Sequence, residues 1–207
     1  MKTLLKLNTS IHSEAGESSR LANELVAAWR ARNPGGTVIV RDLAHEPVPH
    51  LTAERFQAFL TKPGERTPEQ DTVAGYSDRL IGELRRADTI VIGLPMYNFG
   101  VPSTLKAYFD HVARAGETFR YTDQGSVGLL TGKNAYVTAA RGGLYAGTAL
   151  DTQTAYVRNF LGFLGIAHVE FVYAEGLAMG EASKKAGLAR AKTTIELLMH
   201  GALPFAA

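Results

Sequence analysis

The chain has no cysteine among its 207 residues. This absence excludes disulfides, catalysis by a thiolate, and zinc or iron–sulfur centres held by cysteine, and we predict no metal site. An excess of charge of one sign is also missing: the formal net charge is +2, which gives no reason to expect a nucleic-acid partner. No apolar run approaches the length that spans a membrane, and the amino terminus lacks the apolar stretch and cleavage site of a signal peptide. We therefore predict a cytoplasmic protein that binds neither membranes nor nucleic acids.

The chain is long enough to bury one sizeable core, since 45% of its residues are hydrophobic, and it shows no internal repeat or linker. We therefore expect one domain over residues 1–207. Within it, short apolar strands alternate with helical patterns, except at 116–133, where a small hairpin or a loop with one turn is expected. The predicted strands are 4–8, 37–41, 88–93, 134–140 and 168–174, and the predicted helices are 18–32, 53–60, 68–86, 103–112, 150–164 and 181–199.

This alternation decides the fold class. Strands that alternate with helices predict a parallel sheet covered on both faces, because each crossover returns the chain to the same edge. Five strands with this spacing fit a flavodoxin-like, doubly wound α/β sheet in the order 2-1-3-4-5. The six-stranded dinucleotide-binding version would need more chain and a glycine fingerprint after the first strand, and that fingerprint is missing.

The most informative segment is the loop that follows the third predicted strand, between Pro95 and Pro102. It carries an aromatic ring, a carboxamide and a second ring, in Tyr97, Asn98 and Phe99. In open parallel sheets, ligands bind at the edge formed by the carboxyl ends of the strands. Flat rings beside an amide suit a flat heterocycle with hydrogen-bonding edges. The alternative is a surface turn whose rings pack back on the protein, and the loop alone does not decide between the two.

A second loop, residues 9–19, should reach the same edge. It is rich in hydroxyls and leads into the first predicted helix, whose free N–H groups favour a phosphate, with Ser10, Ser18 and Ser19 as further donors. The alternative is that Ser18 only caps that helix. The loop lacks the glycine spacing and lysine of a nucleoside-triphosphate site, so we do not expect ATP or GTP.

A third loop, residues 140–145, contains Arg141, Gly142 and Gly143. Paired glycines let a backbone approach a ring closely, and their N–H groups can face a carbonyl or an electron-rich ring edge. The alternative is an ordinary glycine turn with a solvated arginine. The prediction of a binding site therefore rests on the three loops together.

Several longer motifs make this prediction more specific. The segment 94–99, followed by YFDHVARAG at 108–116 and FRYT at 119–122, resembles the FMN-dependent NADH azoreductase (NADH:quinone oxidoreductase) family. The resemblance extends over nearly the whole chain. It implies a flavodoxin-like fold, a homodimer with both active sites at the interface, and noncovalently bound FMN. It also implies reduction of quinones and azo compounds with NADH or NADPH as electron donor. Further matching segments are 41–44, 132–133, 141–143 and 160–166.

The resemblance also assigns roles to matching residues. Gly16 and Ala140 stand where relatives often carry serine, so side-chain hydrogen bonds can be lost there while backbone ones remain. Residues 56–65 match poorly, so a substrate preference is not inherited. The implied cofactor residues are Ser10, Gly16, Glu17 and Ser18 at the phosphate and ribityl chain, Met96, Tyr97, Asn98 and Phe99 at the isoalloxazine ring, and Ala140, Arg141, Gly142 and Gly143 on the ring's other edge. The implied substrate-pocket residues are Tyr121 and Phe163, the latter contributed across the dimer.

In such enzymes the cofactor carries the redox chemistry. The implied mechanism is ping-pong: the nicotinamide delivers a hydride and leaves, and the acceptor then takes two electrons at the same face of the flavin. A quinone needs one such cycle, whereas an azo bond needs two to yield aromatic amines. We assign no catalytic side chain: His12, Tyr121 or water can supply protons, but a lone histidine in a polar loop is usually only solvated. His111 is expected to face solvent or an interface.

Other interpretations of the sequence stay open. Quinones can be the main acceptors, with azo compounds incidental. A one-electron carrier of flavodoxin type is an alternative, although flavodoxins are usually shorter and strongly acidic, and a regulatory module without flavin is another. For Phe160 and Phe163, helical spacing favours the core and the resemblance favours an interface. The sequence leaves open the physiological acceptor and the choice between NADH and NADPH.

Overall fold

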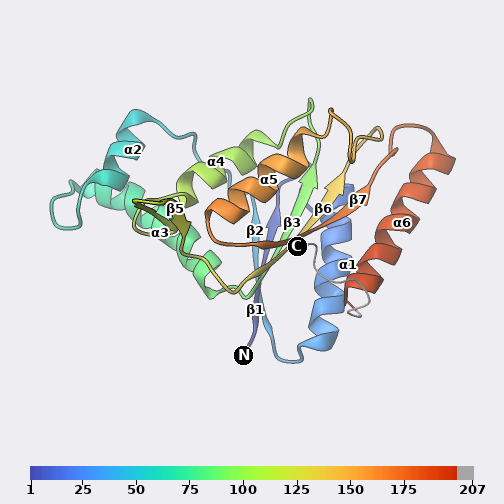
Figure 1. The fold of residues 1–207 in the computed structure, drawn as a ribbon, viewed down its shortest axis with the longest axis horizontal. Coiled ribbons are helices and arrows are strands. Elements are labelled where there is room, and N and C mark those ends of the chain that lie inside the picture. Colours follow the sequence, from blue (N-terminus) through green and yellow to red (C-terminus); the bar gives the residue numbers. More distant parts are fainter. Residues whose placement is uncertain (200–207) are drawn as a thin grey trace.

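The computed structural model describes residues 1–199. Its centre is a five-stranded parallel sheet in the order β2-β1-β3-β6-β7, and a separate two-stranded hairpin, β4-β5, lies outside it (Figure 1). Counted along the chain, the five sheet strands have the predicted order 2-1-3-4-5, which confirms the flavodoxin-like topology. The strands are β1 (Thr3–Asn8), β2 (Thr37–Asp42), β3 (Thr89–Pro95), β4 (Phe119–Thr122), β5 (Gly125–Gly128), β6 (Asn134–Ala140) and β7 (His168–Ala174).

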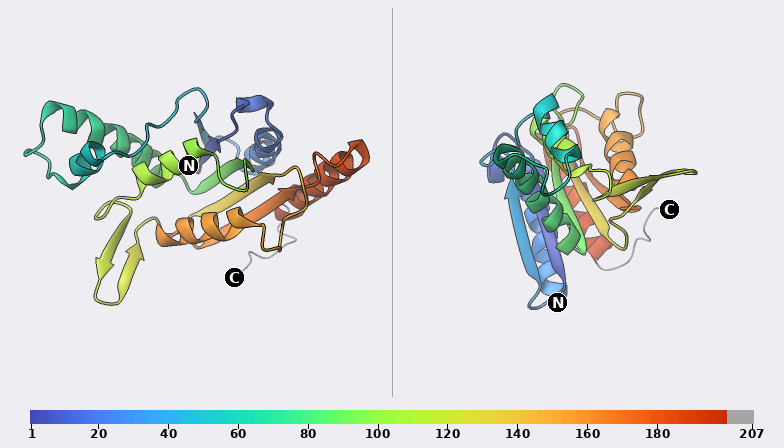
Figure 2. Two further views of the ribbon diagram at one scale, coloured as in Figure 1. Left: turned by 90° about the horizontal axis from the view of Figure 1, so that it is seen from above. Right: turned by 90° about the vertical axis from the view of Figure 1, so that its left-hand side faces the viewer.

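Helices cover both faces of the sheet (Figures 1 and 2). The helices α1 and α6 pack on one face, and α3, α4 and α5 pack on the other. Within residues 1–199, no helix is both long and apolar enough to cross a lipid bilayer. The helices are α1 (Glu17–Arg32), α2 (Ala53–Leu60), α3 (Pro68–Arg86), α4 (Ser103–Val112), α5 (Thr152–Phe163) and α6 (Glu181–Met199), with a short 3-10 turn, η1 (Ser13–Ala15), before α1.

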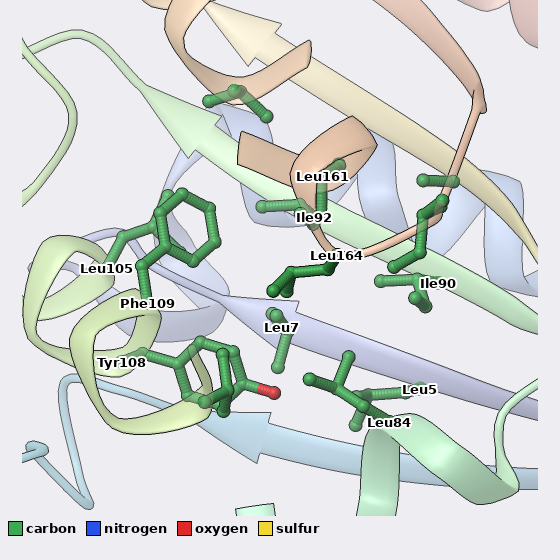
Figure 3. Close-up of a cluster of buried hydrophobic side chains, with 14 of the residues drawn as sticks. Leu5, Leu7, Leu84, Ile90, Ile92, Leu105, Tyr108, Phe109, Leu161 and Leu164 are labelled. Carbon is green, nitrogen blue, oxygen red and sulfur yellow. The ribbon is translucent and has the colours of Figure 1, made fainter. Parts of the chain in front are cut away.

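The core follows from the alternation of side chains along each strand. Every residue of β3 is buried, as expected of a central parallel strand. Its Val91 faces α1 and α6, whereas its Ile90 and Ile92 face α3, α4 and α5. Figure 3 shows the second of these clusters, where Tyr108 and Phe109 of α4 meet the sheet side chains.

Local signals fix most helix boundaries. Thr67 and Gln70 form a capping box at the start of α3: the Thr67 hydroxyl accepts from the Gln70 N–H at 3.3 Å, and the Gln70 side chain accepts from the Thr67 N–H at 3.1 Å. Pro68 occupies the first turn, as predicted. The predicted end of β3 at Gly93 was wrong by two residues. Pro95 lacks an N–H, but at the last position of a strand this does not prevent pairing.

His111 also differs from its prediction. The side chain is fully buried rather than exposed, because α2 folds over α4 and places Phe59 against the imidazole, at 5.6 Å between ring centres. The imidazole Nδ1 donates to the Ala107 carbonyl at 2.9 Å. Burial lowers the pKa of His111, which favours the neutral ring. His111 is therefore a packing residue between helices.

The β4-β5 hairpin confirms the hairpin expected within 116–133, and it is mounted on the end of α5. The Leu130 N–H donates to the Leu164 carbonyl at 2.8 Å. Beside this bond, Gly128 lies so close to Gly165 that a Cβ on Gly128 would overlap the Gly165 backbone nitrogen. These contacts hold the hairpin against the end of α5. Figure 2 shows that it projects from the end of the molecule opposite α6.

The surroundings of Gly128 and of Gly75 predict opposite effects of replacing each glycine by alanine. Gly128→Ala should destabilise the protein by about 1–3 kcal/mol, because backbone atoms must move to admit the methyl group. Gly75→Ala in α3 should instead stabilise it by about 0.5–1 kcal/mol, since no atom lies within 4 Å of the added Cβ. Urea unfolding of both variants at one flavin concentration measures the difference. Equal stabilities would show that the hairpin is not held by this contact.

Candidate functional site

Three loops meet at the carboxyl edge of the sheet, after β1, β3 and β6, where the topology predicts a ligand site (Figure 1). The Met96 N–H donates to the Ala140 carbonyl at 3.0 Å, which joins the second and third loops. The Tyr97 hydroxyl lies 3.3 Å from Ser10 Oγ, which joins the first and second. Between the loops is a pocket of about 180 Å³, lined by Ser10, His12, Gly16, Glu17, Ser18, Pro95, Met96, Tyr97, Ala140, Arg141, Gly142 and Leu177.

The start of α1 closes one end of this pocket. Its N-cap is Gly16, which has no side chain to bond the helix, so the interpretation of Ser18 as a cap was wrong. The first hydrogen bond within the helix runs from the Arg20 N–H to the Gly16 carbonyl at 3.0 Å, so among residues 1–199 the N–H groups of residues 17–19 have no backbone acceptor. The Ser18 and Ser19 hydroxyls are buried and have no partner among residues 1–199. Free N–H groups and an unpartnered hydroxyl at a helix N-terminus fit an anionic group.

The absence of a side chain at residue 16 has a steric cause. A Cβ on Gly16 would come within 2.7 Å of Ser10 Cβ. The Ser10 side chain thus occupies the space that a serine at residue 16 would need. Ser10 Oγ accepts from the His12 N–H at 3.1 Å, so it also shapes the loop itself.

A network of polar side chains supports the first loop. The Glu14 carboxylate accepts from the buried Lys6 Nζ at 2.9 Å and from Asn8 Nδ2 at 2.6 Å. Burial raises the pKa of Glu14, but hydrogen bonds from Asn23, Lys6 and Asn8 outweigh it and hold that pKa below its usual value. Asp42 accepts from the Ser13 hydroxyl. These contacts fix the loop without using the hydroxyls that face the pocket.

The second loop ends in a tight two-residue turn. Tyr97 and Gly100 exchange backbone hydrogen bonds of 3.2 and 2.9 Å. Between them, Asn98 and Phe99 adopt positive φ angles of 49° and 60°, which is uncommon for residues other than glycine. The Phe99 ring is half exposed and packs edge-on against Tyr145 of the third loop, at 5.6 Å between centres. Strained residues of this kind gather at ligand sites.

Arg141 is buried rather than solvated, so the alternative of an ordinary glycine turn with a solvated arginine was wrong. Its guanidinium pairs with Asp151 at 2.7 Å and with Glu175 at 3.2 Å, and it lies 5.0 Å from the Tyr173 ring centre. Burial raises the pKa of Asp151, but the Arg141 bond and bonds from Thr154 outweigh it, and the net pKa is lowered. Arg141 therefore acts as an internal support of the loop.

The two glycines that follow Arg141 present backbone donors. Among residues 1–199, the N–H groups of Gly142 and Gly143 have no hydrogen-bond acceptor. A Cβ on Gly143 would come within 2.7 Å of the Tyr145 ring, so a side chain at residue 143 would have to displace that ring. The third loop is thus held rigidly, with two N–H groups left for a ligand.

Tyr121 and Phe163, the predicted substrate-pocket residues, lie away from this pocket. Both contact Phe119 of the hairpin, with ring centres 5.4 Å and 4.3 Å away. Phe163 ends α5, whereas the first turn of α5 supports the pocket loops, so the length of that helix separates the two.

Several residues at or near the pocket were missed by the sequence analysis, among them Leu177, which lines the pocket. Asp151 caps α5 and pairs with Arg141, and Gln153 donates to backbone carbonyls of the second loop. The available signal was weak: a carboxylate before a helix indicates only a cap. A buried glutamine has no sequence pattern of its own.

Comparison with known proteins agrees with this geometry. A family model described as "Flavodoxin-like fold" matches residues 1–198. The chain is 54% identical over 196 residues to the FMN-dependent NADH:quinone oxidoreductase of Cellvibrio japonicus, covering 95% of this chain and 98% of that protein. It is 52% identical over 192 residues to the protein of the same name from Alcanivorax borkumensis, covering 93% and 97%.

A solved structure is similar over the same length. The FMN-dependent NADH-azoreductase of Bacillus anthracis, in complex with FMN, superimposes with a TM-score of 0.88 at 27% identity and covers 99% of this chain and 100% of its own. The shared topology, the pocket at the carboxyl edge and these relatives lead to one conclusion. The chain belongs to the family of FMN-dependent NADH:quinone oxidoreductases with a flavodoxin-like fold.

Proposed function

We propose that this protein reduces quinones and azo compounds, with FMN as a noncovalent cofactor and NADH or NADPH as electron donor. The observation that carries the proposal is the buried Ser18 hydroxyl at the N-terminus of α1, which has no partner among residues 1–199 and lines a pocket shared with the Tyr97 loop. An anion site beside a loop of flat side chains fits a ligand with a phosphate at one end and a ring system at the other. The names of the relatives support FMN as that ligand.

Different groups of pocket residues suit the two ends of such a ligand. The free N–H groups of α1, with Ser10 and Ser18, suit the phosphate. The loop of Met96, Tyr97, Asn98 and Phe99 suits one side of the ring, and Gly142 and Gly143 offer N–H donors to its other edge. Ala140 can contribute only backbone groups, and the charge of Arg141 is already balanced by two carboxylates.

When bound, FMN supplies the hydride and electron transfer itself. The residues of this chain bind and orient the ring and exclude water from it. We assign no side chain of the pocket as a general acid. The relatives' names favour the reductase over the one-electron carrier.

We further propose a single FMN-binding domain over 1–207 and a cytoplasmic homodimer. Residues 200–207 lie outside the described part of the chain. The Tyr121 side chain is 75% exposed, and Val127 and Leu129 beside it are also exposed, although these residues are far from their own pocket. An exposed apolar patch on a projecting hairpin suits the pocket of a second copy. A solution mass equal to one chain, measured by light scattering, would contradict the dimer.

The phosphate end can be tested by one hydroxyl. Ser18→Ala should raise the dissociation constant for FMN by about tenfold, because a hydrogen bond to a charged group is lost. The dissociation constant for riboflavin, which has no phosphate, should change little. Fluorescence titration of the apoprotein measures both values. Thr193→Ala, which removes an exposed hydroxyl from α6, is the matched control and should leave both values unchanged. An equal loss of affinity for FMN and for riboflavin would show that Ser18 does not bind the phosphate.

The activity can be tested by removing the cofactor. We expect the apoprotein to lose NADH-dependent reduction of benzoquinone and to regain it when FMN is added. Rates with benzoquinone and methyl red then rank the quinone and azo activities. Undiminished turnover by the flavin-free protein would exclude the proposed function.

A further inference from the structure

The turn of the second loop is held in a conformation that one of its two central residues, Phe99, disfavours. Asn98 and Phe99 both have positive φ, and a phenylalanine gains nothing locally from that conformation. The Phe99 side chain is 49% exposed, so burial in the core does not hold it either. Apart from the bonds between Tyr97 and Gly100, contacts from another part of the chain are needed to keep the turn in place.

Gln153 supplies those contacts. Its side chain is fully buried, and its Nε2 donates to the carbonyls of Pro95 and Gly100, each at 2.9 Å. These two carbonyls stand at either end of the loop, so one carboxamide group ties its beginning to its end. Because carbonyls only accept, the orientation of the amide is fixed by the contacts themselves. The neighbouring Thr152 hydroxyl donates to the Phe99 carbonyl within the turn.

The same helical turn also supports the third loop. Asp151, which caps α5 by accepting from the Thr154 N–H at 3.1 Å, pairs with Arg141 at 2.7 Å. The first turn of α5 therefore carries both loops predicted to hold the ring. The loop at the phosphate end is held instead through Lys6 and Glu14. The two halves of the pocket thus have different supports, and they meet at the Tyr97 hydroxyl, which lies 3.3 Å from Ser10 Oγ and accepts from the Ile11 N–H at 3.3 Å.

We propose that Gln153 is a positioning residue that fixes the ring-side loop, residues 95–100, and thereby sets the affinity for the flavin ring but not for its phosphate. This inference rests on the proposed function, because it takes the ligand to be a flavin. It goes further by assigning a role to a residue that does not line the pocket. A purely structural role predicts a loss of folding stability alone. The positioning role predicts an equal loss of affinity for FMN and for riboflavin, because the two ligands share the flavin ring.

The test compares two flavins on apoprotein variants. Gln153→Met keeps the length of the side chain but removes both donors. It should weaken the binding of FMN and of riboflavin by the same factor, about tenfold. The ratio of the two affinities stays at the wild-type value, unlike in Ser18→Ala. Gln153→Glu places carboxylate oxygens against the Pro95 and Gly100 carbonyls and should weaken both flavins more strongly. The visible circular dichroism of the bound flavin should change in both variants.

Controls separate this result from misfolding. Gln57→Met, at an exposed position of α2, should leave both affinities unchanged. If Gln153→Met does not fold, Thr152→Val removes one bond to the turn and should weaken both flavins by a smaller, equal factor. Lower thermal stability of a folded variant with wild-type flavin affinities would overturn the positioning role, as would a loss confined to FMN. Failure of the wild-type protein to bind either flavin would instead overturn the proposed function.

Discussion

The site depends on the buried guanidinium of Arg141. It lies between Asp151 and Glu175 and joins the loop after β6 to the first turn of α5 and to the segment after β7. Breaking a buried ion pair leaves a charge without compensation, so these elements hold their positions together. Glu175 also accepts the N–H groups of Tyr145 and Ala146, at 2.9 and 2.8 Å, which extends the support along the third loop. Arg141, which the sequence analysis predicts as a cofactor-binding residue, is therefore mainly an internal support of the fold.

This support leaves other groups free for a ligand. The hydroxyl of Ser18, the first N–H groups of α1 and those of Gly142 and Gly143 have no acceptor in the described part of the chain. Donors that are already in place lose little conformational freedom when a ligand binds. The Tyr97 hydroxyl, 3.3 Å from Ser10 Oγ, links the first and second loops. The pocket therefore combines rigid walls with unused donors, the arrangement that a tightly held, noncovalent cofactor needs.

Local patterns carried most of the fold prediction. Residues 53–60 form α2 as predicted, because capping and periodicity act within one turn. Contacts between distant elements could not be predicted in the same way. His111 is buried by a helix about fifty positions earlier in the chain, and Arg141 finds Glu175 far along the sequence. Gln153 bonds only backbone carbonyls, which leave no trace in the sequence. The cofactor came from the resemblance, and the loops alone indicated only a phosphate and a flat ring.

We infer that one flavin bridges the three loops at the carboxyl edge of the sheet. Hydrogen–deuterium exchange of the apoprotein with and without FMN tests it most directly. We expect slower exchange in residues 10–19, 96–100 and 141–145 together, since all three loops border the pocket. Exchange in residues 190–199 of α6 should not change. Protection limited to one loop, or protection that is strongest in α6, would show that no flavin bridges the three loops.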